Sequence, residues 1–134
     1  MRWSRLLFGL SAALLLLGGW SHAAAYQKVV AAVAGSNLPA YFGNALKALW
    51  LMDSSGMFVL AATCGLVAIR PRAASSSVML LLALIPAATA ALLYLFIGRF
   101  LGAHLLLVTS VAMLVAAACL PAGAPSSTRA SPGR

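Results

Sequence analysis

The fold class follows from one apolar stretch of the sequence, ALWLMDSSGMFVLAATCGLVAI, at residues 48–69. It begins after Lys47, and Asp53 is its only charged residue. About 20 predominantly apolar residues let a helix cross the hydrocarbon of a bilayer. The stretch also lacks the alternation of period two that a lipid-facing β-barrel strand requires. We therefore predict a membrane-spanning helix over residues 47–69.

Three further runs of the same kind predict three more spans. They extend from Leu6 to Gln27, from Ala73 to Gly98 and from Phe100 to Leu120. Segments with Gly, Pro and Ser separate the runs, and these residue types end helices and begin new ones. The predicted fold is an all-α polytopic membrane protein, in which residues 1–120 form a four-transmembrane-helix bundle of two antiparallel hairpins. The spans cover about residues 4–25, 47–69, 76–97 and 101–120, and residues 121–134 are predicted to be a disordered cytoplasmic tail.

The composition is typical of a chain that lipid, not water, surrounds. Hydrophobic residues make up 63% and charged residues 7% of the chain, against about 45–50% and about 25% in globular domains. In a soluble protein the net charge of +8 would suggest a nucleic-acid partner. Here the basic residues stand singly or in pairs at the edges of apolar runs, and no basic face tracks a phosphate backbone. We therefore expect a lipid bilayer, and no nucleic acid, as the partner.

The basic residues also predict the orientation, because cytoplasmic loops carry the excess of Lys and Arg. With the N-terminus inside, the inner side holds six of them: Arg2, Arg5, Arg70, Arg72, Arg129 and Arg134. The outer side then holds three: Lys28, Lys47 and Arg99. Both termini are therefore predicted to be cytoplasmic.

One alternative concerns the first run. Arg2 and Arg5, the Leu-rich stretch and the alanines at 23–25 have the layout of a secretory signal peptide with its cleavage site. Cleavage of residues 1–25 would leave three spans. Against cleavage, the apolar run continues past this point through Val29 and Val33. The first run also pairs with the second as a hairpin.

The residues that favour a functional site lie near one end of the predicted bundle. Asp53 is the only acidic residue of the chain, and an ionisable group inside a span usually faces the bundle interior and has a partner. In a hairpin that turns at Asn37, His22 lies within one residue rise, about 1.5 Å, of Asp53 in depth. The second hairpin brings Tyr94 and His104 to the same level, near its turn. The predicted polar cluster is His22, Asp53, Tyr94, Arg99 and His104.

Three interpretations of this cluster stay open. In the first, it is a set of structural contacts, since hydrogen bonds between membrane helices are worth about 0.6 kcal/mol each. In the second, the Asp53–His22 pair takes up and releases protons in a small proton-coupled carrier. In the third, the two histidines hold haem, or the protein is linked to quinone, in a redox membrane protein.

Motifs for catalysis are not found in the sequence, which has no phosphate-binding glycine loop, no HExxH and no GxSxG. We therefore expect no enzyme, no catalytic residue, no metal site and no required cofactor. The predicted function is that of a non-enzymatic structural or accessory component of a membrane. Its expected partner is another membrane protein or a second copy of the chain.

The arginine-flanked start and the segment GGWSH at residues 18–22 resemble those of small four-helix inner-membrane proteins of bacteria. In size and layout the chain is similar to DoxX-like proteins. This resemblance implies the bacterial inner membrane as its location. Small multidrug-resistance transporters are less similar, because they carry a glutamate in the first helix, where this chain has no acid.

Overall fold

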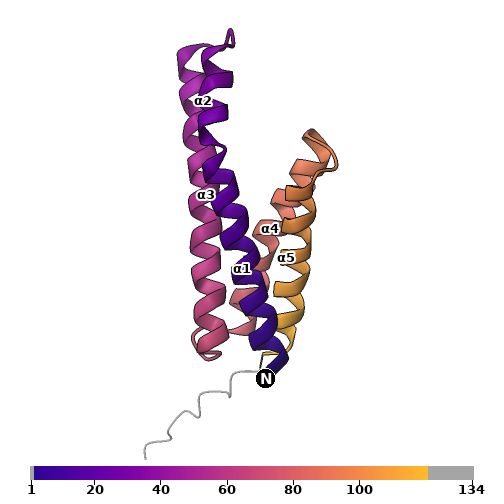
Figure 1. The fold of residues 1–134 in the computed structure, drawn as a ribbon. Coiled ribbons are helices and arrows are strands. Elements are labelled where there is room, and N and C mark those ends of the chain that lie inside the picture. The colour runs from indigo at the N-terminus through magenta and orange to yellow at the C-terminus, as the bar shows by residue number, and fades with distance from the viewer. Residues whose placement is uncertain (1, 121–134) are drawn as a thin grey trace, which may run out of the picture.

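A computed structural model describes residues 2–120 of the chain and builds these residues from helices and short turns (Figure 1). The helices are α1 (Arg2–Ala24), α2 (Tyr26–Ala34), α3 (Ala40–Ile69), α4 (Ser76–Phe96) and α5 (Leu101–Ala118). With α1 and α2 taken together, four helices are long and apolar enough to cross a membrane. The predicted all-α, four-helix fold is therefore confirmed. The predicted tail, residues 121–134, lies outside the described residues.

The first hairpin, made of α1, α2 and α3, is longer than the predicted spans of residues 4–25 and 47–69. Its first arm extends from Arg2 to Ala34 over 33 residues, and α3 has 30 residues. At about 1.5 Å per residue, both arms exceed the roughly 30 Å of hydrocarbon in a bilayer. The second hairpin, made of α4 and α5, has arms of 21 and 18 residues. Figure 1 shows the first hairpin extending beyond the second.

A break at Ala25 separates α1 from α2, and a side chain of α3 explains it. The Nε1–H of Trp50 donates a hydrogen bond of 2.8 Å to the carbonyl oxygen of His22. In an unbroken helix this oxygen would accept from the N–H four residues on. Here it accepts from the N–H of Ala25, at 3.2 Å. A tertiary contact that enters the hydrogen-bond ladder therefore sets this boundary, without a Gly or Pro at the break.

The second hairpin follows its sequence signals closely. The hydroxyl of Ser75 accepts a hydrogen bond of 3.3 Å from the N–H of Val78, which caps the start of α4. Gly98, in the turn to α5, has a φ of +99°, a conformation that glycine adopts freely and that other residues avoid. As a result, α4 and α5 begin at the predicted residues 76 and 101.

The four spans pack in the order α3, α1, α5, α4. The main interfaces are α1 with α3, α4 with α5 and α1 with α5, whereas α3 and α4 form no comparable interface. In Figure 1 the hairpins meet near the N-terminus and diverge toward the α4–α5 turn. We call these two ends of the bundle the closed end and the open end.

The buried core lies toward the closed end. Its large, fully buried side chains are Phe8 of α1, Val67 of α3, Met79 of α4 and Met113 of α5. Toward the open end, the buried positions hold small residues: Gly19, Ser54, Ala90 and Ala103. Large side chains therefore fill the space between helices at the closed end, whereas small ones leave space at the open end.

Two hydrogen bonds join α4 to α5. The hydroxyl of Ser110 donates to the carbonyl oxygen of Ala83 at 2.9 Å, and that of Ser76 donates to the carbonyl oxygen of Ala117 at 2.6 Å. Pro86, buried inside α4, supplies no N–H to the helix, which leaves the carbonyl oxygen of Leu82, four residues earlier, without its usual donor. The second hairpin is thus held by polar contacts as well as by packing.

Candidate functional site

An inter-hairpin cleft of about 490 Å³ lies between the two hairpins at the open end. Its lining includes Gly18 and His22 of α1, Trp50 and Asp53 of α3, Leu93 of α4, Phe100 of the turn, and Leu106 of α5. A second cavity, of about 310 Å³, is bounded mainly by α3 and α4 where these two helices lack an interface. Asp53 lines both spaces. The only acid of the chain therefore lies where the two hairpins leave room between them.

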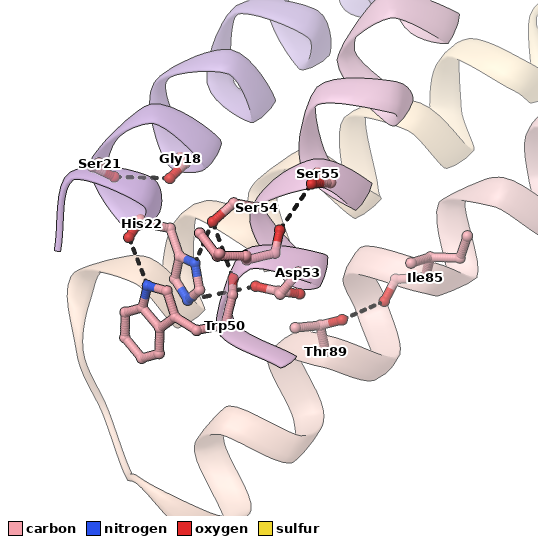
Figure 2. Close-up of polar contacts among 10 residues, drawn as sticks. Gly18, Ser21, His22, Trp50, Asp53, Ser54, Ser55, Ile85 and Thr89 are labelled. Carbon is pink, nitrogen blue, oxygen red and sulfur yellow. Dashed lines mark hydrogen bonds and ion pairs between the residues drawn. The ribbon is translucent and has the colours of Figure 1, made fainter. Parts of the chain in front are cut away.

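His22 is the centre of the polar contacts in this cleft (Figure 2). Its Nδ1 lies 2.9 Å from the Oγ of Ser54, and its Nε2 lies 3.6 Å from the Oδ2 of Asp53. Its ring stacks on the indole of Trp50, with the centroids 3.9 Å apart and an interplanar angle of 11°. Because these partners are three and four residues apart on α3, they share one helix face. One face of α3 thus surrounds a single side chain of α1.

The contacts of Ser54 favour one position for the proton of the neutral His22 ring. The hydroxyl of Ser54 donates its one proton to the carbonyl oxygen of Trp50, at 3.1 Å. In that arrangement the hydroxyl accepts from His22, and Nδ1 is the protonated nitrogen of the neutral ring. Nε2, which faces Asp53, then has no proton to offer to the carboxylate. A neutral His22 therefore leaves the charge of Asp53 uncompensated.

The other three predicted residues lie apart from this pair. The Nδ1–H of His104 donates to the carbonyl oxygen of Phe100 at 2.7 Å, and its ring meets that of Tyr94 edge-on, with centroids 5.4 Å apart. Tyr94, His104 and Arg99 line a separate cavity on the second hairpin. In place of the expected single ring, the structure has the His22–Asp53 pair in the inter-hairpin cleft and the other three residues at a separate cavity. Depth along a helix follows from counting residues, but the direction in which a side chain points does not.

Three residues at the site were not predicted as site residues: Trp50 and Phe100, which line the cleft, and Ser54, which is buried outside the lining and contacts His22. Ser54 follows Asp53 and lies four residues after Trp50, so helical spacing was a usable signal for its place beside them. Phe100 carries no such signal, because an aromatic residue in a turn of a membrane protein is expected at any interface. Only the approach of the two hairpins brings Phe100 to the cleft.

The positions of the His, Cys and Asp side chains also determine whether the described residues could bind a metal or haem. Within residues 2–120, no three His, Cys, Asp or Glu side chains come together as a metal-ligand set. His22 and His104 line different cavities. This arrangement does not bring the two histidines to opposite faces of one haem.

Comparison of the chain with protein-family models, with characterised proteins and with solved structures gives no match. The fold and the site therefore define a class. The chain is a small multi-pass membrane protein of two helical hairpins, with a mainly apolar cleft between them and a His–Asp pair in its lining.

Proposed function

We propose that this chain is a non-enzymatic accessory component of the bacterial inner membrane that binds amphiphilic molecules in its inter-hairpin cleft. The observation that carries the proposal is the cleft, in which apolar walls meet the polar side chains of His22 and Asp53, with Ser54 buried beside His22. Small-molecule sites are typically concave, mostly apolar and about 300–1,000 Å³ in volume, with a few polar groups that orient the ligand. A cleft of about 490 Å³ falls in this range.

The depth of the polar group also favours an amphiphile. Ile97 and Phe100, at the α4–α5 turn, line the same cleft as His22. Since a span of about 20 residues ends at such a turn, this level corresponds to the headgroup region. A tail that lies against Leu93 and Leu106 would extend from here into the hydrocarbon, with its headgroup at Asp53.

Photo-crosslinking tests this proposal. An alkyl amphiphile with a diazirine in its tail is added to the protein in phosphatidylcholine vesicles, and the labelled residues are mapped by mass spectrometry. We expect saturable labelling of cleft residues. Leu93→Trp places a larger side chain in the cleft and should suppress this labelling. Leu92→Trp should leave the labelling unchanged, because Leu92 is exposed and lies outside the cleft lining. Labelling that stays unsaturated and insensitive to Leu93→Trp would refute the proposal.

A second candidate function is a proton-coupled carrier, and the 3.6 Å separation of His22 Nε2 and Asp53 Oδ2 is the observation that favours it. Histidine changes charge near neutral pH, so this pair has the chemistry to exchange a proton with the cleft. The test is proton flux into vesicles that contain the protein. Asp53→Asn should abolish the flux, while Ser55→Asn, at an exposed neighbour outside the cleft lining, should preserve it. A flux that survives Asp53→Asn excludes this mechanism.

The proposed orientation, with both termini in the cytoplasm, has a direct test. Ser36 and Ala73 are exposed residues in the turns at opposite ends of the first hairpin. In a chain without Cys64 and Cys119, Ser36→Cys should react with a membrane-impermeant maleimide added to intact cells, and Ala73→Cys should not. The reverse pattern would invert the topology. The same chain, with its mass measured, shows whether residues 1–25 are cleaved.

A further inference from the structure

We infer that the ligand of the inter-hairpin cleft carries an organic ammonium headgroup that pairs with Asp53. This inference rests on the proposed function and specifies its ligand. The starting observation is charge: the chain carries a net charge of +8 and one acidic residue, and that residue lines the cleft. Its side chain is 41% exposed, so the carboxylate is accessible from the cleft.

No Lys or Arg side chain among the described residues that line the cleft or the cavity between α3 and α4 is available to pair with Asp53. His22 is the nearest group that can carry positive charge, and Ser54 directs the proton of the neutral ring to Nδ1, away from Asp53. A carboxylate beside apolar walls, with no cation of the protein to pair with, favours a cationic ligand.

The aromatic residues of the cleft suit an organic cation. Trp50 and Phe100 line the cleft from opposite hairpins. Aromatic faces attract ammonium groups through their quadrupole, most strongly where water is excluded. An inorganic cation would gain nothing from the apolar walls. An alkyl ammonium compound, in contrast, uses the carboxylate, the aromatic rings and the walls together.

This arrangement also makes a proton compete with the ligand. When His22 binds a second proton, its Nε2–H faces Oδ2 of Asp53 and compensates the carboxylate. The other groups that surround the pair carry no charge: Trp50 and Ser54 of α3, Leu93 and Ile97 near the end of α4, and Phe100 and Leu105 on the side of α5. Ligand binding should therefore weaken as the pH falls and His22 takes up this second proton.

Fluorescence quenching tests the headgroup. In a Trp3→Phe, Trp20→Phe chain, Trp50 is the one remaining tryptophan, and a bromine atom quenches it on contact. Three brominated alkyl amphiphiles of equal tail length are compared in vesicles of digalactosyldiacylglycerol, a neutral lipid without an ammonium group: a trimethylammonium, a maltoside and a sulfate. We expect the trimethylammonium compound to quench at about tenfold lower concentration than the maltoside, against the overall positive charge of the protein.

Substitutions test whether Asp53 is responsible for the preference for the trimethylammonium compound. Asp53→Asn should remove the tenfold preference and retain quenching by the maltoside, which shows that the variant is folded. Asp53→Glu and Ser55→Asn should keep the preference. His22→Gln should keep the preference as well, and binding of the trimethylammonium compound to this variant should no longer weaken at low pH.

Failure of the ammonium ligand and failure of the amphiphile site give different results in this experiment. Equal quenching by the cationic and neutral compounds, or a preference that survives Asp53→Asn, overturns the ammonium ligand and leaves the amphiphile site intact. A lack of saturable quenching by all three compounds overturns the amphiphile site itself. Adding phosphatidylethanolamine identifies the source of the ammonium group: competition assigns the site to a lipid amine, and a lack of competition assigns it to a free amphiphilic cation.

Discussion

The closed and the open end of this bundle are built from the same four spans, but different side chains lie between the helices. At the closed end, Phe8, Met79 and Met113 are fully buried among their neighbours. At the open end, the buried positions of the same helices hold Gly19 and Ala90, and a cleft of about 490 Å³ lies between the hairpins. The difference shows how a chain of 134 residues combines a packed anchor with a ligand-sized space.

The two ends should also differ in how much stability a substitution removes. In lipid, the association of helices depends on close packing and on hydrogen bonds, because the tails of lipids are as apolar as the side chains. Loss of a large side chain at the closed end therefore removes many contacts. Changes at the open end should cost less stability, because fewer large side chains are packed there. Four predictions test this contrast, in order of the expected effect.

Phe8→Ala should have the largest effect on stability. Truncation of a buried Phe typically costs about 3–5 kcal/mol, and Phe8 is fully buried at the closed end. The control is Leu17→Ala on the same helix, where the side chain is 60% exposed to lipid and the expected cost is below about 1 kcal/mol. The measurement is the free energy of unfolding in mixed micelles. Equal costs for the two variants would mean that the closed end is not a packed anchor.

Gly19→Val tests the close approach of α1 and α3 beside the cleft. A Cβ at Gly19 would lie 3.2 Å from Cβ of Met57 and 3.2 Å from Cε1 of Phe58, so a branched side chain must push the helices apart. We expect a loss of about 1–3 kcal/mol. The control is Gly9→Val on the same helix, where a Cβ meets no atom within 4 Å. If both variants lose the same free energy of unfolding, helix propensity and not packing is responsible.

Gly98→Ala tests the turn that positions the far wall of the cleft. At a φ of +99°, alanine is strained, and we expect a loss of about 1–2 kcal/mol in the free energy of unfolding. Gly56→Ala is the counterpart inside α3, where the added Cβ meets no atom within 4 Å. That substitution should stabilise the chain by up to about 1 kcal/mol, because alanine favours a helix. A neutral Gly98→Ala would show that this turn relaxes without strain.

Ser54→Ala should have the smallest effect on stability, about 0.6 kcal/mol, which is typical of one hydrogen bond between membrane helices. Its effect on His22 should be larger, because Ser54 is the partner that keeps the proton on Nδ1. Nitrogen NMR of labelled histidine should show the Nδ1–H form of His22 in the native chain and a mixture of the two forms in Ser54→Ala. His104, held by the carbonyl oxygen of Phe100, serves as the internal reference. An unchanged His22 spectrum would contradict the role given to Ser54.

The sequence by itself determined the number of spans, their pairing into hairpins and the matching depth of His22 and Asp53. Uninterrupted apolar runs and their Gly, Pro and Ser boundaries were sufficient for the first two. Counting residues from the turn was sufficient for the third, and the side chains of His22 and Asp53 come to within 3.6 Å. These properties are one-dimensional, because rise per residue converts position in the chain directly into depth in the membrane.

The tertiary structure decided which side chains face one another. It pairs His104 with Tyr94 at the separate cavity of the second hairpin, interrupts the first arm at Ala25 through the indole of Trp50, and turns Phe100 toward the cleft. Apolar residues surround each helix on every side, as the exposed Leu17, Leu81 and Val59 illustrate, so hydropathy marks no inward face. The rotation of each helix about its axis was set by the packing of large side chains at one end and small ones at the other, and that packing exists only once the helices meet.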